Sequence, residues 1–410
     1  MKIYRFERGQ ALIIVALALV GLAAMAGLVI DGGNAFADRR QAQNAADSAA
    51  LDAAYMRING GTDLVSAALE SASRNGYDNN GVTNTVQVHS PPASGPHEND
   101  LEYIQVIIVS HVKTYISSVV GREEIINTVT ATARTKTPEV TKLLNGAAVV
   151  SLAPNSDCNN DKSFWVHGET TLSIRGGGIW VNSGNNTCAL IEQGSGSLRL
   201  QDGYNIDVVG GASIQKAHLL TPAVTVGAVP INYPPPFMMP KIGCGDELAE
   251  VSPDGSTMSP GSWGDVFPPP GVTHLQSGIY CLDNGINITN DIEGHNVVFK
   301  VMDGEVRFSS EADILLDAPN HGKHAGLLIY LPMDNPHKVV LNGGSGSVIK
   351  GTILAPASHI VIKGLSSRVG FHSQIIGYTI EADGTNNVEI VYDEEQNYHA
   401  LNMPEVQLSE

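Results

Sequence analysis

Residues 285–318, "GINITNDIEGHNVVFKVMDGEVRFSSEADILLDA", show the pattern that is typical of the C-terminal half of the chain. Aliphatic and polar residues alternate in short runs, and glycine, asparagine and aspartate separate one run from the next. Such alternation is typical of strands with one buried face, and the separating residues are typical of turns. The stretch therefore predicts a succession of short strands and no helix.

Similar runs continue on both sides of this stretch, and no helical period is visible from Leu144 onward. The runs recur roughly every 20 residues, as in repeat folds whose coils stack their inward aliphatic side chains. We expect an all-β domain over residues 144–400, built as a right-handed parallel β-helix. A β-sandwich, which also uses many short strands, is the alternative.

A proline-rich segment at about residues 222–270 interrupts the runs with "YPPPFMMP" and "VFPPPGV". Proline has no N–H for a strand ladder, so we expect no regular strand there. The segment is predicted to be a long insertion on the β-helix surface, held by Cys244. Loops of this length are usually functional or disordered, which makes it a candidate binding surface. An inert cover for a coil edge is the alternative.

The four cysteines, Cys158, Cys188, Cys244 and Cys281, all lie in the second half of the chain. None forms a CxxC pair, which excludes zinc-finger and thioredoxin-like sites on spacing. In an exported protein an even number of cysteines indicates disulfides, with three possible pairings, and four buried thiols are the alternative. We predict the pairs that are nearest in sequence, Cys158–Cys188 and Cys244–Cys281.

Candidate catalytic and metal-binding residues are few. HExxH, GxSxG and phosphate-loop motifs are absent from the sequence. Two sets of polar residues are close in sequence: Asp313, Asp317, His321 and His324, and the alternating oxygen ligands of Asp157, Asn159 and Asp161. The first set could line the groove of a polysaccharide-cleaving β-helix enzyme. The second set has the hard oxygen ligands of a calcium site but lacks the glycine and distal glutamate of an EF-hand loop. Because turn aspartates and loop histidines usually face solvent, we expect no catalytic residue, metal or cofactor, and no enzyme activity.

The net charge of the chain indicates which kind of partner to exclude. The chain has 410 residues, enough for two or three domains, and a net charge of −18. An acidic chain repels phosphate backbones, so we expect no nucleic-acid partner.

Residues 11–30 form an apolar run without a charge. As a helix the run is roughly 30 Å long, enough for a bilayer core. Lys2, Arg5 and Arg8 precede it, so the positive-inside rule places the N-terminus in the cytoplasm and everything after Asp31 outside. We expect residues 1–30 to be a cytoplasmic stub and a single-pass anchor in the cell membrane.

A cleaved signal peptide and a pilin spine are the alternative interpretations of this run. A cleaved signal peptide would end at the small-x-small stretch 24–26, but the apolar run continues beyond it. A pilin spine is indicated by "RGQ" at residues 8–10, which looks like a prepilin peptidase site. However, Ile14 stands where a type IV pilin carries the glutamate needed for filament docking.

The run "DGGNAFADRRQAQNAADSAALDAA", residues 31–54, continues the helix with a stripe of small residues that would allow close backbone approach. Together with "RGQ" and the apolar span, it resembles the N-terminus of TadG-like proteins of bacterial Tad pilus-assembly systems, grouped as putative Flp pilus-assembly TadE/G-like. Ser48 departs from the family pattern. The positions that match are Arg8, Gly9, Gln10, Asp31, Gly33, Arg39, Arg40, Gln43, Ala45, Ala46, Asp47, Ala49, Ala50, Leu51, Ala53 and Ala54.

Two helices followed by three strands are expected to form a small α+β domain over residues 31–136, as in TadG-like proteins. "GTILAPASHIVIKG", residues 351–364, resembles the β-helical regions appended to some of them. The resemblance implies a structural protein of pilus assembly or surface adhesion. Its implied partners are the membrane, other pilus-assembly or envelope proteins, and surface glycans. An anchored carbohydrate-active enzyme and a secreted binding module are the alternatives.

Overall fold

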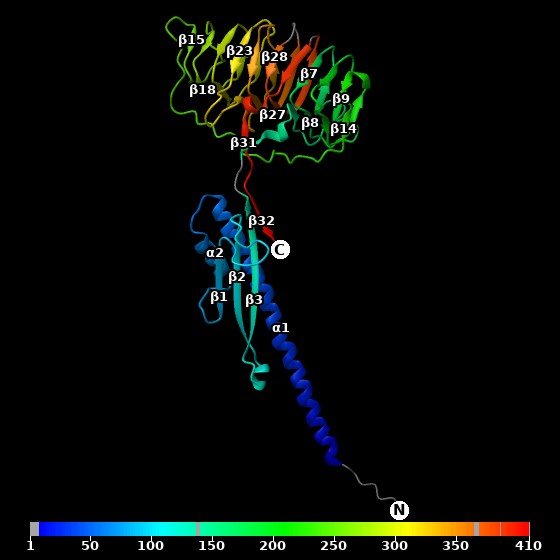
Figure 1. The fold of residues 1–410 in the computed structure, drawn as a ribbon, viewed down its shortest axis with the longest axis vertical. Coiled ribbons are helices and arrows are strands. Elements are labelled where there is room, and N and C mark those ends of the chain that lie inside the picture. The colour runs from blue at the N-terminus through cyan, green and yellow to red at the C-terminus, as the bar shows by residue number, and fades with distance from the viewer. Residues whose placement is uncertain (1–7, 137–139, 365–368, 386, 410) are drawn as a thin grey trace, which may run out of the picture. The chain divides into compact units, whose positions relative to one another are not determined.

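The computed structural model describes residues 8–136, 140–364, 369–385 and 387–409. The chain divides into two compact units, Met1–Pro138 with Pro404–Glu410, and Glu139–Met403. We call the first the α+β domain and the second the parallel-strand domain (Figure 1).

The α+β domain consists of two helices and an antiparallel sheet, and its helix-then-strand order confirms the expectation from sequence. Helix α1 spans Arg8–Ile58 without a break, and α2 spans Leu64–Arg74. The sheet has the order β1-β2-β3-β32. Its strands are β1 (Asn84–His89), β2 (Tyr103–Lys113), β3 (Glu124–Lys136) and β32 (Glu405–Ser409), with the short helix η1 (Ser117–Val120) between β2 and β3.

The core of this domain is formed by small side chains of α1 against branched side chains of the sheet. Seven alanines of α1 are completely buried between the helix and the sheet. Their small side chains allow the helix backbone to lie close to the strands. They are Ala42, Ala45, Ala46, Ala49, Ala50, Ala53 and Ala54, and they pack with Ile104, Val106, Ile108 and Val129. Asp63 caps α2 by accepting a hydrogen bond from the Ser66 N–H at 3.0 Å.

The parallel-strand domain contains two long sheets in its described residues, and every pairing within these sheets is parallel. The first has ten strands. In spatial order they are β13 (Leu220–Thr221), β10 (Ser197–Leu200), β7 (Thr171–Arg175), β30 (Asn387–Val391), β28 (Val369–His372), β26 (Val348–Lys350), β23 (Ile314–Asp317), β20 (Ile292–Gly294), β17 (His274–Leu275) and β15 (Thr257–Met258).

The second sheet has sixteen strands. Its main path is β14 (Val224–Val226), β11 (Ile206–Val208), β8 (Ile179–Val181), β5 (Val149–Ser151), β29 (Ile375–Gly384), β27 (Thr352–Gly364), β24 (Leu327–Tyr330), β21 (Val297–Val301), β18 (Gly278–Leu282) and β16 (Gly261–Trp263). Off this path lie β6 (Phe164–Val166), β9 (Leu190–Glu192), β12 (Ala212–Ile214), β19 (Ile286–Ile288), β22 (Val306–Phe308) and β25 (Val339–Leu341).

The inward side chains of successive coils stack in register. Ile349 pairs with Phe371, Phe371 with Ile390, and Ile390 with Ile174, and all four side chains are fully buried. Parallel ladders of this kind are expected for stacked coils, whereas a β-sandwich is built from antiparallel strands. The region is therefore the all-β domain that the alternating aliphatic residues predict.

The strand order shows that the chain enters this domain in the middle of the stack. The strands from β5 to β14 are added outward in one direction, and those from β15 to β30 begin at the opposite end and return. At the meeting point β7 pairs with β30, and β5 and β6 pair with β29. We call these pairings the seam. In Figure 1 the red C-terminal strands accordingly lie between the yellow and the green ones.

The first and last strands of the parallel-strand domain lie next to each other. β4 (Val140–Lys142) pairs antiparallel with β31 (His399–Leu401). Outside the domain, β3 precedes it and β32 follows it, and these two strands also pair. The short helices of the domain are η2 (Leu143–Gly146), η3 (Ala217–Leu219) and η4 (Glu394–Gln396).

Residues 227–256, which we call the crossing segment, connect β14 at one end of the stack with β15 at the other. The expectation that residues 222–270 contain no regular strand is wrong, because β14, β15 and β16 lie within them. These strands have only two or three residues each, and the prolines fall outside them.

The crossing segment is fixed along its length. Asn182 donates to the Ile231 carbonyl at 2.8 Å and accepts from its N–H at 2.7 Å. Lys300 donates to the Ile242 carbonyl at 3.0 Å. Phe237 and Ile242 are buried in a second apolar cluster with outward side chains of the sixteen-stranded sheet, including Val298. The segment therefore covers an apolar sheet face.

Both disulfides have the predicted pairing. Cys158–Cys188 joins the loop before β6 to the residues before β9, and β6 and β9 are neighbouring strands. Cys244–Cys281 joins the crossing segment to β18. No cysteine remains free.

The Cys244–Cys281 disulfide should hold the crossing segment on the domain surface. Replacing Cys244 and Cys281 by serine removes the closure of a 37-residue loop, so we expect a loss of about 2–4 kcal/mol in the free energy of unfolding, measured in denaturant. We also expect faster protease cleavage within residues 231–256. The matched control replaces Cys158 and Cys188, whose separation of 30 residues is similar, and should leave that cleavage unchanged. Equal cleavage in both variants would contradict the assigned role of Cys244–Cys281.

Candidate functional site

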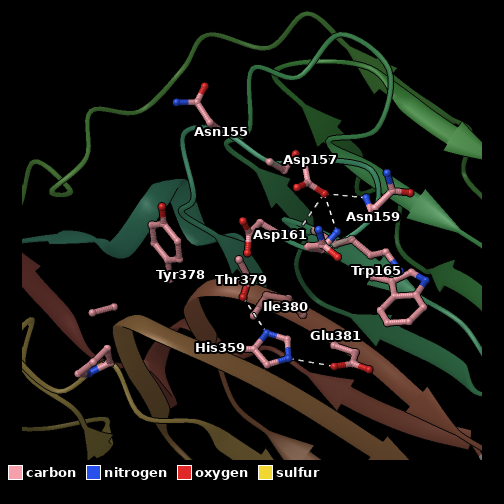
Figure 2. Close-up of a pocket in the computed structure, with 15 residues that line it drawn as sticks. Asn155, Asp157, Asn159, Asp161, Trp165, His359, Tyr378, Thr379, Ile380 and Glu381 are labelled. Carbon is pink, nitrogen blue, oxygen red and sulfur yellow. Dashed lines mark hydrogen bonds and ion pairs between the residues drawn. The ribbon is translucent and has the colours of Figure 1, made fainter.

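A pocket of about 760 Å³ lies on the outer surface of the parallel-strand domain (Figure 2). One wall is the loop 155–162, which precedes β6. The other residues around it include Trp165 of β6, His359 of β27 and the run 378–381 of β29. The pocket thus draws on strands from both sides of the seam.

Strand register decides which side chains reach the pocket. Ile360, Ile380 and Phe164 are paired neighbours on β27, β29 and β6, and all three are buried in the core. Because successive side chains of a strand point to opposite faces, the adjacent Glu381 and Trp165 project outward.

Five side chains on the outer face form a connected group, which we call the His–carboxylate row. Glu381 contacts two imidazoles, His359 Nε2 at 2.9 Å and His167 Nε2 at 2.8 Å. The other ring nitrogen of His167 lies 3.5 Å from Asp383. Lys363 Nζ lies 3.6 Å from the same aspartate, so nitrogen groups and carboxylates alternate along the row.

The row keeps Glu381 ionised. Hydrogen bonds from His359 and then His167 lower the pKa of its carboxyl from 4.5 to about 2, although burial acts in the opposite direction. Glu381 is therefore an anion over the whole physiological range, and both of its oxygens accept hydrogen bonds.

The row also contains groups that could hold a metal ion. One ligand atom each from His167, Glu381 and Asp383 lie within 4.8 Å of one another. Imidazole and carboxylate ligands suit Zn²⁺. In the structure His167 Nε2 contacts Glu381 at 2.8 Å and His167 Nδ1 lies 3.5 Å from Asp383, so these three groups pair with one another.

Trp165 stands beside the row, and both faces of its indole ring are covered. The His167 ring stacks on it with centroids 3.6 Å apart, and Lys162 Nζ lies 3.2 Å from the indole ring centroid. Sugars usually stack on a free aromatic face. Trp165 offers no such face in this arrangement.

The loop 155–162 brings together the three residues considered as calcium ligands. The Asp157 carboxylate accepts hydrogen bonds from the backbone N–H groups of Asn159 at 2.7 Å, Asn160 at 2.6 Å and Asp161 at 3.2 Å. These bonds, with that of Asn160 the strongest, lower the pKa of the Asp157 carboxyl. The carboxylate holds the turn together, while Asn159 and Asp161 are exposed.

The residues considered as a catalytic group have separate partners. Asp317, at the end of β23, bonds to His295, whereas Asp313, before β23, accepts from the Gly346 N–H at 2.9 Å. His321 is exposed. Burial, with the nearby Lys323, lowers the pKa of His324.

No motif or spacing in the sequence indicates the His–carboxylate row. His167 and Glu381 are 214 positions apart, and they meet only because β29 pairs with β6 at the seam. The signal that could have located them is the outward register of each strand, which becomes useful only when the order of the coils is known.

The comparisons with known proteins concern the N-terminal segment. Residues 9–56 match the family described as Tad: Putative Flp pilus-assembly TadE/G-like. No curated protein and no solved structure matches the chain. The match covers the apolar run and the buried alanines of α1, and it confirms the TadG-like resemblance over these residues. The similarity to the TadE/G-like family is thus shown for residues 9–56.

The His–carboxylate row should make stability depend on pH. The folded pKa of Glu381 lies below its ordinary value of 4.5, so the carboxylate stabilises the fold above about pH 4.5, and this contribution is lost as the pH falls toward 2. Glu381→Gln should therefore lower the free energy of unfolding at pH 7 by about 1–3 kcal/mol. The difference from the wild type should shrink between pH 4.5 and 2 in denaturant titrations.

The control is Glu305→Gln, which changes an exposed glutamate that pairs with Arg307 at 3.4 Å. It should differ little from the wild type at any pH. If Glu381→Gln gave the same small, pH-independent change as this control, the row would have no stabilising role.

Proposed function

We propose that this protein is a membrane-anchored structural component of a Tad/Flp-type pilus-assembly system or of the surface adhesion that such a system supports. The observation that carries the proposal is the family match at residues 9–56. The match extends over the apolar run and over the alanines with which α1 packs on the sheet.

The exposure of α1 supports the anchor. Among the described residues, α1 is the one helix long and apolar enough to cross a membrane. Its side chains from Leu12 to Ile30 are mainly exposed, whereas a core helix of a soluble domain would bury them. Residues 12–30 extend for about 28 Å as a helix, close to the thickness of a bilayer core.

Two features support export of the domains after the anchor. The basic residues Lys2, Arg5 and Arg8 precede the apolar run, which favours a cytoplasmic N-terminus. The two disulfides are typical of proteins outside the cytoplasm.

A structural role is favoured over the enzyme alternative by how the polar side chains are used. Asp313 and Asp317 bond to different neighbours, and both oxygens of Glu381 accept from histidines. A glycoside hydrolase needs a carboxyl group that can donate a proton, and the depressed pKa of Glu381 does not suit it for that role.

Deletion and complementation in the host cell test the proposal. We expect deletion to reduce the number of surface pili in electron micrographs and the attachment of cells to a surface. The wild-type chain should restore both. A chain whose residues 1–30 are replaced by a cleavable signal peptide should restore neither, because it is released from the membrane.

Three outcomes decide between the alternatives. Unchanged pili and attachment after deletion would contradict the pilus role, and full restoration by the released chain would favour a secreted binding module. Glu381→Gln, carried on the anchored chain, should restore both properties. If it failed while the purified variant remained folded and had lost a glycan-cleaving activity, the enzyme alternative would be correct.

A further inference from the structure

The tip of the β2–β3 hairpin, residues 114–121, has an unusual surface. No charged residue occurs between Lys113 and Arg122. Tyr115 is 70% exposed and Val119 is 83% exposed, and Ile116 is also exposed. Three large apolar or aromatic side chains thus meet solvent within five residues of a turn.

The tip is hydrogen-bonded to α1 where the apolar run of the helix ends. The Asp31 carboxylate, which is 2% exposed, accepts hydrogen bonds from the backbone N–H groups of Tyr115 at 2.9 Å, Ile116 at 3.1 Å and Ser117 at 2.7 Å. Gly27 lies against Ile116 so closely that an added Cβ would be 2.1 Å from Ile116 Cγ2. The glycine and the aspartate together fix the position of the tip along the helix.

This position places the tip at the depth of the membrane surface if α1 spans the bilayer. Gly27 lies four residues, about 6 Å, before Asp31, the first charged residue after the apolar run. Ile116 contacts the helix at Gly27, one turn inside the apolar run. A side chain at that level lies at the boundary between hydrocarbon and headgroups.

We propose that residues 114–121 insert into the outer interface of the membrane that α1 spans, as a second membrane contact. The inference rests on the proposed anchor. The occupant is the lipid surface, because the exposed tip continues directly from the apolar helix surface that the membrane would cover.

Most backbone N–H groups of the tip have hydrogen-bond partners within the protein, which suits the tip to the membrane interface. Asp31 satisfies three N–H groups, and within η1 the Val119 N–H donates to Ile116 and the Gly121 N–H donates to Ser118. Unsatisfied backbone groups are costly in lipid, so this internal bonding removes the main penalty of insertion. Tyrosine is enriched at membrane interfaces, and charged side chains flank the tip on both strands.

Spin labels on the full-length protein in vesicles of phosphatidylethanolamine and phosphatidylglycerol test the inference. Single cysteines would replace Val119 at the tip, Val20 in the apolar run, and Leu101, which is 77% exposed at the opposite end of the hairpin. The native cysteines are all in disulfides. Collision of each label with oxygen, which concentrates in lipid, is compared with collision with a water-soluble nickel chelate.

We expect labels at Val20 and Val119 to favour oxygen and the label at Leu101 to favour nickel. If Val20 favoured oxygen while Val119 behaved like Leu101, the anchor would stand and the inference would be wrong. If Val20 itself favoured nickel, both the anchor and the inference would fail. A Val119 label shielded from both reagents would indicate a protein partner at the tip and would also overturn the inference.

A matched pair of glycine substitutions gives a second test. Gly27→Leu should push Ile116 away from α1 and shift the Val119 label toward nickel, while the Val20 label still favours oxygen. Gly21→Leu should change neither label, because no atom lies within 4 Å of the position of its Cβ. Equal effects of the two substitutions on the Val119 label would contradict the proposed fixing of the tip.

Discussion

The pairing at the seam is the constraint on which the parallel-strand domain depends. A stack of coils has two open edges, and exposed strand edges invite pairing with other chains. Here the first coils of the domain pair with the last, through β7 with β30 and β29 with β5 and β6, so the two halves form one continuous stack that ends at β13 and β14 on one side and at β15 and β16 on the other. Because the chain starts in the middle of the stack, it must travel from one end to the other, and the crossing segment is the result.

The pairing at the seam also determines where the His–carboxylate row forms and how the parallel-strand domain is connected to the α+β domain. His167 comes from the first coils, whereas His359, Glu381 and Asp383 come from the last, so the His–carboxylate row joins the two halves of the stack. The two ends of the domain meet at β4 and β31, and the chain continues on both sides into paired strands, β3 and β32. The domain is therefore inserted between two neighbouring strands of the α+β domain and tethered by two chain segments.

Features that depend on residues close together in the sequence could be predicted correctly from the sequence alone. Alternating aliphatics predicted the strands, an uncharged run predicted the exposed part of α1, and the alanine stripe predicted close packing with the sheet. Sequence proximity also gave both disulfides correctly. The order of the coils was beyond reach, because each coil presents the same alternating pattern and local patterns carry no information on which coils are neighbours. The His–carboxylate row and the path of the crossing segment from one end of the stack to the other depend on that order, so local patterns could not predict them.

A cross-link between β7 and β30 is the direct test of the pairing at the seam. Thr171 and Asn387 are paired on β7 and β30, and residues paired on neighbouring strands lie about 5 Å apart. With cysteines at both positions, a short bifunctional maleimide should link them rapidly within one chain, whereas cysteines at Thr171 and Asn287, which lie on strands several coils apart, should remain unlinked. If both cysteines of the first pair reacted singly and no link formed, the seam would be wrong, and with it the arrangement of the crossing segment and of the His–carboxylate row.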